Sequence, residues 1–173
     1  MIPTFRIARL KADPETGAAL AQLLVEVVAN GGSVSFMHPL SMDDAAAFWT
    51  DSLTKAEAGA RVVLGAWDGN DLVGTVTLDM GMPPNQPHRA DIAKLMTRVS
   101  QRGRGVARSL MREAERIAAE HGRTLLVLDT AIEDGAAGLY DSLGYQRVGV
   151  IPDFALKPHG GLTGTIVFFK RLG

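Results

Sequence analysis

The chain has 173 residues, the size of one domain, and 46% of them are hydrophobic, which is enough to form a core. Its formal net charge of −1 argues against binding nucleic acid through the phosphate backbone. The lack of cysteine excludes a disulfide scaffold and a thiolate nucleophile, and the four histidines show no metal-ligand spacing, so we expect no metal. The apolar stretches are too short for a signal peptide or a membrane span, so we expect a cytoplasmic protein without a membrane partner.

Hydrophobic periodicity predicts a series of strands and helices. In chain order these are a strand over 5–10, helices over 14–30 and from about Ser41, strands over 61–67, 72–80 and 88–97, a helix over 105–121, a strand over 124–128, a helix over 134–143, and strands over 144–150 and 165–170. The run 124–128 is apolar throughout, which is typical of a strand covered on both faces. Central hairpins followed by helical crossovers indicate a mixed α/β fold. We therefore expect one domain over 1–173, with a twisted sheet of about seven strands and helices on both faces.

A glycine-rich turn, Arg102-Gly103-Arg104-Gly105-Val106-Ala107, lies between a predicted strand and the longest predicted helix. Glycines let the backbone approach a ligand, and free amides at a helix N-terminus suit a pyrophosphate. A Walker A loop would need Gly-Lys followed by Ser or Thr, and a dinucleotide fingerprint would need glycine at Arg108. The turn instead resembles the coenzyme A-binding sequence Q/R-x-x-G-x-G/A of GNAT acetyltransferases. A plain strand–helix connection is the alternative.

A second motif, Ala-Ala-Gly-Leu-Tyr-Asp-Ser-Leu-Gly-Tyr, occupies residues 136–145. It resembles the GNAT ending A-x-x-L-Y-x-x-x-G-F, with Tyr145 in place of phenylalanine. When an amine attacks the thioester in such an enzyme, a phenol near the sulfur can protonate the departing thiolate. Tyr140 is therefore the expected proton donor, and the alternative is that it only packs beneath the sheet.

Nearly the whole chain is similar to the tabtoxin-resistance-type acetyltransferases. The matching stretches are 31–37, 88–92, 94–96, 102–106, 128–130, 147–149 with Pro152, and 169–170. This resemblance implies a GNAT fold and acetyl-CoA as the acetyl donor. It also implies a small amino-acid-like amine as the acceptor, with tabtoxinine-β-lactam, and hence toxin resistance, as the family's example.

The resemblance implies roles for individual residues. The strand backbone at Leu95, Met96 and Thr97 would pair with the pantetheine arm and polarise the thioester carbonyl. Residues 102–107 would hold the pyrophosphate. Asp129 lies where the family places a carboxylate beside the acetyl-transfer centre.

Direct attack on the thioester needs a neutral amine, and an amine with a pKa of about 9–10 is mostly charged at pH 7. Asp129 is the first candidate base, for which burial would have to raise its pKa, or water would have to relay the proton. Alternatively, Asp129 only binds the acceptor ammonium or caps the following turn, and Asp91 and Glu133 are lesser candidates for the base. The apolar, flexible-looking loop over 33–40 is expected to shape the acceptor pocket. The remaining candidates for acceptor contacts are Ser35, Phe36, Met37 and Asp91. The alternative for Phe36 and Met37 is that they fill the core.

The chain departs from the GNAT pattern at two places, and the sequence leaves other functions open. Thr97-Arg98-Val99 stands where Val-x-Pro is usual, and Glu133 stands where many members carry an asparagine that contacts the coenzyme. A peptide or protein amine is a second acceptor class, and so is a polyamine, although the loops 33–41 and 81–90 lack carboxylates. A non-catalytic coenzyme A sensor is a third hypothesis. The sequence is compatible with a monomer or a homodimer.

Overall fold

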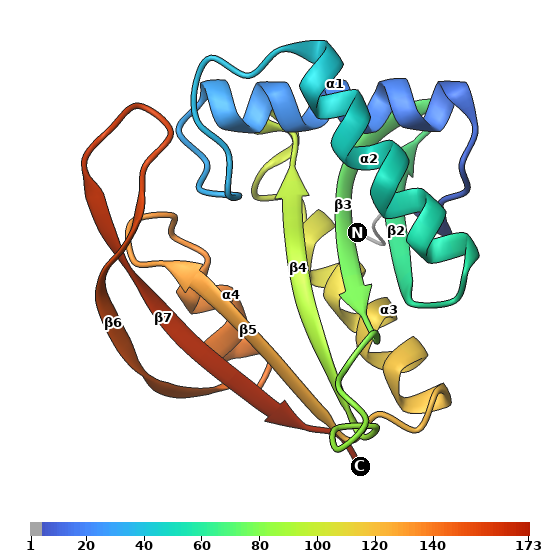
Figure 1. Cartoon of the computed structure of the whole chain (residues 1–173), viewed down its shortest axis with the longest axis vertical. Helices are drawn as coiled ribbons and strands as arrows, with labels where there is room; N and C mark the ends of the chain where they lie inside the picture. The colour runs from blue at the N-terminus through green and yellow to red at the C-terminus, as the bar shows by residue number, and fades with distance from the viewer. Residues whose placement is uncertain (1–4) are drawn as a thin grey trace.

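The computed structural model describes residues 5–173, and there the elements follow the predicted order (Figure 1). The strands are β1 (Arg6–Arg9), β2 (Arg61–Asp68), β3 (Asp71–Asp79), β4 (Arg89–Thr97), β5 (Leu125–Ala131), β6 (Gln146–Leu156) and β7 (Leu162–Arg171). The helices are α1 (Pro14–Ala29), α2 (Met42–Glu57), α3 (Val106–Glu120) and α4 (Ala137–Ser142), with a 3₁₀ turn at Val99–Gln101. One mixed sheet has the order β1-β2-β3-β4-β5-β7-β6, so the predicted fold class is confirmed.

The first two helices begin where the sequence supplies capping side chains. The Asp13 carboxylate accepts a hydrogen bond from the backbone N–H of Thr16 at 2.8 Å, and the Ser41 hydroxyl accepts one from the N–H of Asp44 at 3.1 Å. Each of these caps satisfies an amide that the helix itself leaves free. Gly31, at φ 88°, ends the first helix in the left-handed conformation that glycine adopts readily.

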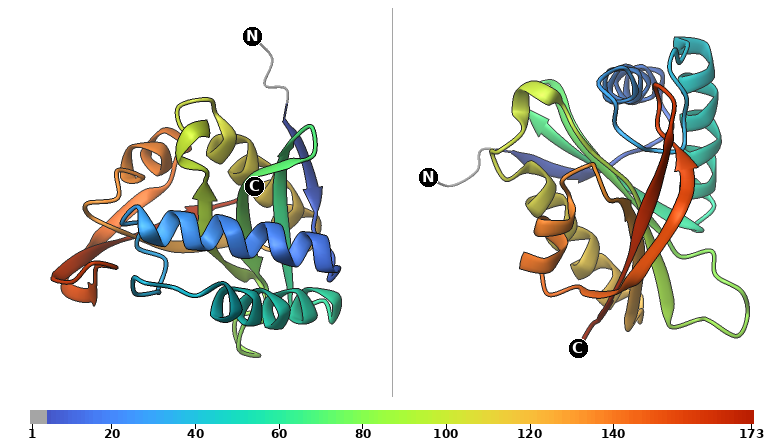
Figure 2. Two further views of the ribbon diagram at one scale, coloured as in Figure 1. Left: turned by 90° about the horizontal axis from the view of Figure 1, so that it is seen from above. Right: turned by 90° about the vertical axis from the view of Figure 1, so that its left-hand side faces the viewer.

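Two layers of helices enclose the sheet. Figure 2 shows α1 and α2 on one face and α3 and α4 on the other. A core beneath α1 and α2 surrounds the fully buried Trp49 and takes its strand residues from β2, β3 and β4. A second core beneath α3 extends from β2 across the sheet to Phe168 on β7. The helix layer on the α1 face is therefore narrower than the sheet.

This narrow layer explains why the prediction of a strand covered on both faces at 124–128 is wrong. The side chains that face α3 and α4 are buried, whereas the alternate ones are half-buried or exposed. The buried residues are Leu126, Leu128 and Thr130, and the others are Leu125, Val127 and Asp129. The opposite face of β5 is thus left open beside the α1–α2 layer.

β4 and β5 are neighbours in the sheet but are paired over only a short distance. Their parallel register covers Arg89–Asp91 against Leu125–Val127, and beyond it the two strands diverge (Figure 1). A β-bulge also interrupts β4, because two residue steps on β3 correspond to three on β4 between Ala93 and Met96. Lys94 lies in this bulge with φ 53°. The upper half of β4 therefore has a free edge.

The last strands are longer than predicted, and β6 forms an edge of the sheet. β6 runs to Leu156 instead of residue 150, and β7 begins at Leu162 instead of residue 165. Two register irregularities interrupt the β6–β7 pairing, and Asp153, next to Pro152, has φ 51°. The predicted helix over 134–143 is shorter than expected, because residues 132–136 form a turn.

Close packing at Gly74 fixes the start of α3. A Cβ atom added at Gly74 would lie 2.6 Å from Cγ1 of Val106 and 3.0 Å from the backbone oxygen of Met96. We therefore expect Gly74→Ala to lower the free energy of unfolding by roughly 1–3 kcal/mol, the usual cost of overpacking. Denaturant titration measures this change. The control is Gly17→Ala in α1, where a Cβ meets nothing within 4 Å and a gain of about 0.5–1 kcal/mol is expected. A Gly74→Ala protein as stable as the wild type would contradict this account of the packing.

Candidate active site

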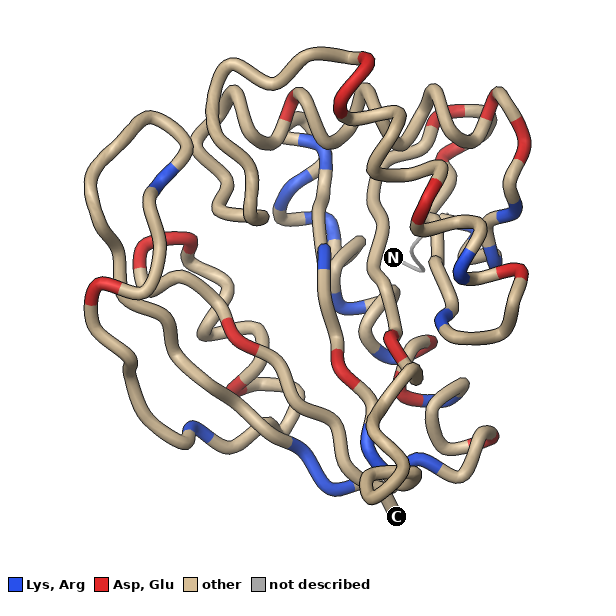
Figure 3. The backbone as a smooth tube through the Cα atoms, viewed as in Figure 1, with Lys and Arg blue, Asp and Glu red and all other residues tan. Residues whose placement is uncertain are grey.

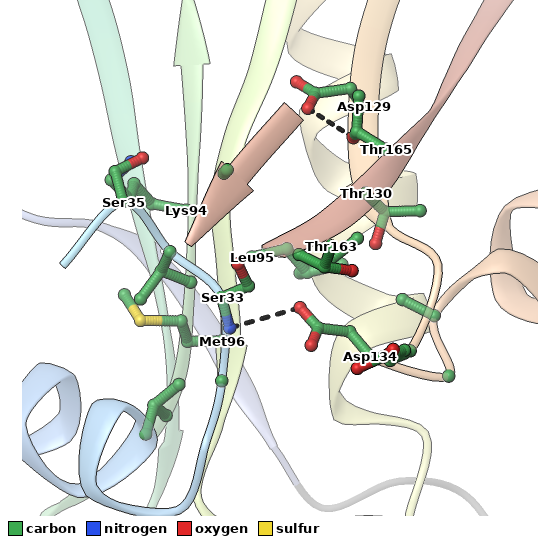
Figure 4. A pocket seen from close by; sticks show the side chains of 18 of the residues that line it. Ser33, Ser35, Lys94, Leu95, Met96, Asp129, Thr130, Asp134, Thr163 and Thr165 are labelled. Carbon is green, nitrogen blue, oxygen red and sulfur yellow. Dashed lines mark hydrogen bonds between the residues drawn. The ribbon is translucent and has the colours of Figure 1, made fainter. Parts of the chain in front are cut away.

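A cavity of about 580 Å³ lies where β4 and β5 diverge. One wall consists of β4 and the segment that follows α1, and the other consists of β5, the segment before α4, and the β6–β7 hairpin (Figure 4). Its volume is in the range typical of ligand sites. Eight of the predicted site residues line it: Ser35, Leu95, Met96, Thr97, Arg102, Ala107, Asp129 and Tyr140.

The glycine-rich turn brings an uncapped helix N-terminus close to the cavity. Gly103 and Gly105 have φ 78° and 84°, and no side chain caps α3, in contrast to α1 and α2. The first turn of α3 also contains no acidic residue. Its backbone amides are therefore free of side-chain acceptors, as a helix end that receives an anion requires.

The side chains of this turn point in different directions. Arg102 lines the cavity. Arg104 instead forms an ion pair with Asp68 at 3.4 Å, and its guanidinium lies over the ring of Phe5 at 5.0 Å. Val106 is buried in the core. A role for Arg104 or Val106 in anion binding would therefore come from the backbone amide.

Tyr140 is buried, with 5% of its surface exposed, on the short helix α4. Its ring packs against those of Tyr145 and Phe168, with centroid distances of 5.8 and 5.5 Å, and the residue also lines the cavity. Burial, together with the nearby Asp129 and Asp134, raises the pKa of Tyr140 above its ordinary value. The phenol is thus protonated at neutral pH.

Asp129 is located on the open face of β5, and its side chain is exposed. The hydroxyl of Thr165 on β7 donates a hydrogen bond to its carboxylate at 2.7 Å (Figure 4). The burial expected for Asp129 is therefore absent, because no helix covers this side of β5. This exposure is compatible with proton transfer through water or with direct binding of an ammonium.

Lys94 is a cavity residue to which the sequence assigned no role. Its ammonium donates a hydrogen bond to the hydroxyl of Ser35 at 3.2 Å and lies 5.7 Å from the ring centre of Phe48. Burial lowers the pKa of Lys94, because partial removal from water disfavours the charged form. The position of the Lys94 side chain at the cavity depends on the β4 bulge, for which the sequence gives no clear signal.

The loop after α1 is held by contacts with two other parts of the chain. The N–H of Ser33 donates to the carboxylate of Asp134 at 3.2 Å, and the N–H of His38 donates to the carbonyl of Pro158 at 2.9 Å. The rings of His38 and His159 are 4.4 Å apart. The tip of the β6–β7 hairpin and the segment before α4 therefore enclose this loop, which was expected to be flexible.

Three of the expected acceptor contacts are not found at the cavity. Phe36 packs edge-to-face on Phe48, and 46% of the surface of Met37 is exposed, but neither lines the cavity. Asp91 forms an ion pair with Arg89 at 2.6 Å, in the part of β4 that is still paired with β5. The loop over 81–90 does not line the cavity either.

Carboxylates reach the cavity from another direction. Asp129, Glu133 and Asp134 line it from β5 and the segment that follows it, and Glu133 is paired with Lys157 at 3.2 Å. Figure 3 shows acidic positions in red on the β5 side of the molecule and basic positions in blue on the upper part of β4; the basic residues that line the cavity are Lys94 and Arg102. Burial raises the pKa of Asp134, and the Ser33 amide opposes this rise. The cavity thus has walls of opposite charge.

The described residues meet neither the requirements of a metal site nor those of a membrane-spanning helix. Within residues 5–173, no three His, Asp or Glu side chains come together as a metal site. None of the helices in the same part of the chain combines the length and apolar character needed to cross a membrane.

Comparison with known proteins assigns the family. The sequence matches the model of the Acetyltransferase (GNAT) family over residues 20–145, so the chain belongs to the GNAT acetyltransferase family. It is 35% identical over 86 residues to N-acetyltransferase 8 of Rattus norvegicus and 36% identical over 80 residues to human N-acetyltransferase 8B. These segments cover 49% and 45% of this chain but only 39% and 35% of the two relatives.

Solved structures share the fold along the whole chain. An N-acetyltransferase from Staphylococcus aureus Mu50 superposes with a TM-score of 0.81 and 17% identity, over 97% of this chain and 99% of that one. A Salmonella typhimurium protein, solved with its cofactor acetyl-CoA, superposes with a TM-score of 0.77 and 16% identity, over 96% and 94% of the two chains. At this level of identity, the similarity establishes the fold.

The partial burial of Lys94 predicts a cost in stability. We expect Lys94→Met to raise the free energy of unfolding at pH 7 by about 1 kcal/mol, since it removes a half-buried cation. Because the folded state lowers the pKa of Lys94, the wild-type lysine becomes neutral as the pH rises through this pKa towards the unfolded value of about 10.4. The cost of burying its charge then disappears, so the stability gained by Lys94→Met should shrink with rising pH. Urea titrations at pH 7 to 10 test both points. Lys11→Met, at an exposed position, is the control, and a gain that grows with pH would contradict the expected burial penalty.

Proposed function

We propose that this chain is a single-domain N-acetyltransferase of the tabtoxin-resistance type, with the domain covering 1–173. It transfers the acetyl group of acetyl-CoA to the amine of a small amino-acid-like molecule. One observation carries the proposal: the same cavity is lined by the flanks of the glycine-rich turn, the free edge of β4, and the side chains of Tyr140 and Asp129. Acetyltransferases of this family use acetyl-CoA as donor.

The described residues fit this cosubstrate. Residues Leu95, Met96 and Thr97 lie on the part of β4 that is not paired with β5, so their free backbone groups are available to the amides of a pantetheine arm. The uncapped amides of α3, with Arg102 beside them, suit the pyrophosphate. Bound acetyl-CoA supplies an acetyl group activated as a thioester.

Asp129, the β4 backbone and Tyr140 have separate roles in the proposed acetyl transfer. Asp129 is an exposed carboxylate that binds the acceptor ammonium and takes up its proton through water. The β4 backbone polarises the thioester carbonyl through a preorganised donor. The Tyr140 phenol, protonated because burial raises its pKa, donates its proton to the departing thiolate.

The enclosure of the cavity supports a small acceptor. The hairpin tip and the loop after α1 are joined by the His38–Pro158 hydrogen bond and by contact between the tilted rings of His38 and His159. Phe154, Ala155 and Leu156 of the same hairpin line the cavity. A protein substrate would need this side to be an open groove.

Turnover by Tyr140→Phe tests the proton donor. Purified protein and acetyl-CoA are mixed with tabtoxinine-β-lactam, amino acids, polyamines and peptides, and free thiol is followed; the chain itself has no cysteine to react. We expect turnover with an amino-acid-like amine, and a fall in kcat of about 100-fold or more in Tyr140→Phe, with little change in acetyl-CoA affinity.

The matched control is Tyr145→Phe. Tyr145 is also buried and touches the ring of Tyr140, but it does not line the cavity. Its variant should keep kcat within about twofold, because a surface of the same shape is retained. Equal losses in the two variants would refute the donor role and indicate packing alone.

Acetyl-CoA affinity in Gly105→Ala tests the anion site. The residue has φ 84°, so an alanine there is strained and should displace the first amides of α3. We expect a loss of affinity of about tenfold, measured by isothermal titration calorimetry, for one weakened charged contact. Gly59→Ala is the control, because Gly59 has φ 85° and lies beyond α2, away from the cavity. A similar loss in Gly59→Ala would mean that strain lowers affinity indirectly.

A further inference from the structure

Lys94 lacks the carboxylate partner that three other lysines of the described chain have. Lys55, Lys157 and Lys170 each contact a carboxylate, at 2.8, 3.2 and 2.8 Å. Within residues 5–173, Lys94 forms no ion pair, although it is partly buried and lines the cavity. A desolvated cation without a counter-ion is unfavourable unless an anionic ligand approaches it.

The hydrogen-bond partner of Lys94 is also held in an unusual conformation. Three non-glycine residues of the described chain have positive φ, and two of them are Ser35 at 76° and Lys94 at 53°. These two residues come from different elements and meet at the cavity through the 3.2 Å hydrogen bond. Strained backbone of this kind is found preferentially at ligand sites, where it aims a side chain.

The opposite wall of the cavity carries the complementary charge. Asp129 and Thr165 lie across the gap from Lys94 and Ser35 (Figure 4). The charge of Asp129 acts on Lys94, but the two side chains do not form an ion pair. A molecule that has an ammonium group at one end and a carboxylate at the other would match both walls.

We propose that Lys94 and Ser35 form a subsite for the carboxylate of an amino acid acceptor, whose amine is directed to Asp129. This subsite rests on the proposed acetyltransferase function and specifies its substrate class. The Lys94 ammonium supplies a charge-assisted hydrogen bond, and the Ser35 hydroxyl can donate a second one. A polyamine would place a second cation against Lys94 and is disfavoured by repulsion.

The test compares amino acids with their own α-carboxamides. Each pair presents the same side chain, but only the acid has a carboxylate for Lys94. The amine of the carboxamide is less basic and is neutral to a larger extent at pH 7, so the chemistry alone favours the amide. Values of kcat and KM are measured by thiol release for tabtoxinine-β-lactam and for a set of such pairs at saturating acetyl-CoA.

We expect the wild type to prefer the acid over its carboxamide by about tenfold or more in kcat/KM, the size of one charged hydrogen bond. Lys94→Gln keeps a polar group of similar length without the charge. It should remove this preference through a higher KM for the acid, with little change for the carboxamide. Ser35→Ala should raise KM for the acid by a smaller factor, and it serves as the second variant if Lys94→Gln is unstable. Lys11→Gln, at an exposed position outside the cavity, should behave as the wild type.

Other outcomes would overturn the subsite. Equal kcat/KM values of the wild type for the acid and its carboxamide would contradict a carboxylate subsite. A Lys94→Gln variant that lowers kcat equally for both would assign Lys94 to the chemical step instead. If no pair is turned over, although acetyl-CoA raises the melting temperature, the subsite fails and coenzyme binding stands. If acetyl-CoA does not raise the melting temperature, the proposed function itself fails.

Discussion

The short pairing between β4 and β5 is the constraint on which the rest of the structure depends. A continuous sheet would use the edge of β4 to bind β5, and the backbone groups of β4 would then be consumed within the fold. Parallel pairing stops after Asp91, opposite Val127. Beyond that point the β4 bulge and the divergence of the strands leave a free strand edge, an open face on β5 and the volume between them. The core beneath α3 extends under both halves of the sheet and holds them together despite the gap.

Three local features at this gap are of a kind that costs stability. Lys94 is a partly buried cation without a counter-ion, Ser35 has a left-handed backbone conformation, and α3 begins without a capping side chain. The caps at Asp13 and Ser41 demonstrate that this chain uses ordinary stabilising devices elsewhere. The exceptions gather around one cavity, where unmet hydrogen-bonding and charge are what a binding site requires.

The sequence predicted the fold well because the elements have strong local signals. Alternation, helical periodicity, caps and turn glycines depend on neighbours in the chain, so the order of strands and helices is recovered. The apolar run at 124–128 was misleading, since the composition of β5 does not reveal that the α1–α2 layer ends before it. The longer β6 was also missed, because exposed valine and phenylalanine residues on both sides of Pro152 gave no continuous strand pattern.

The candidate site was predicted less completely, because its geometry is set by long-range contacts. The glycine turn and Tyr140 belong to local motifs, and Arg102, Ala107 and Tyr140 of these motifs line the cavity. Asp91 was misplaced, since only the register with β5 reveals that it precedes the divergence. The pairing of Lys94 with Ser35 joins positions 59 residues apart through a bulge, and no sequence pattern encodes such a juxtaposition.

The irregular edge strand β6 has a consequence for association between molecules. It is one of the two edge strands of the sheet, and its exposed side chains include Val148, Val150 and Ile151. A straight apolar edge would be a template for strands of other molecules and a hazard for aggregation. The two register irregularities, together with Pro152, which cannot donate a hydrogen bond, interrupt the ladder before a long run of free positions can form. The same irregular strand places Phe154 and Leu156 at the cavity, so the shape that encloses the cavity also interrupts an apolar edge of the sheet.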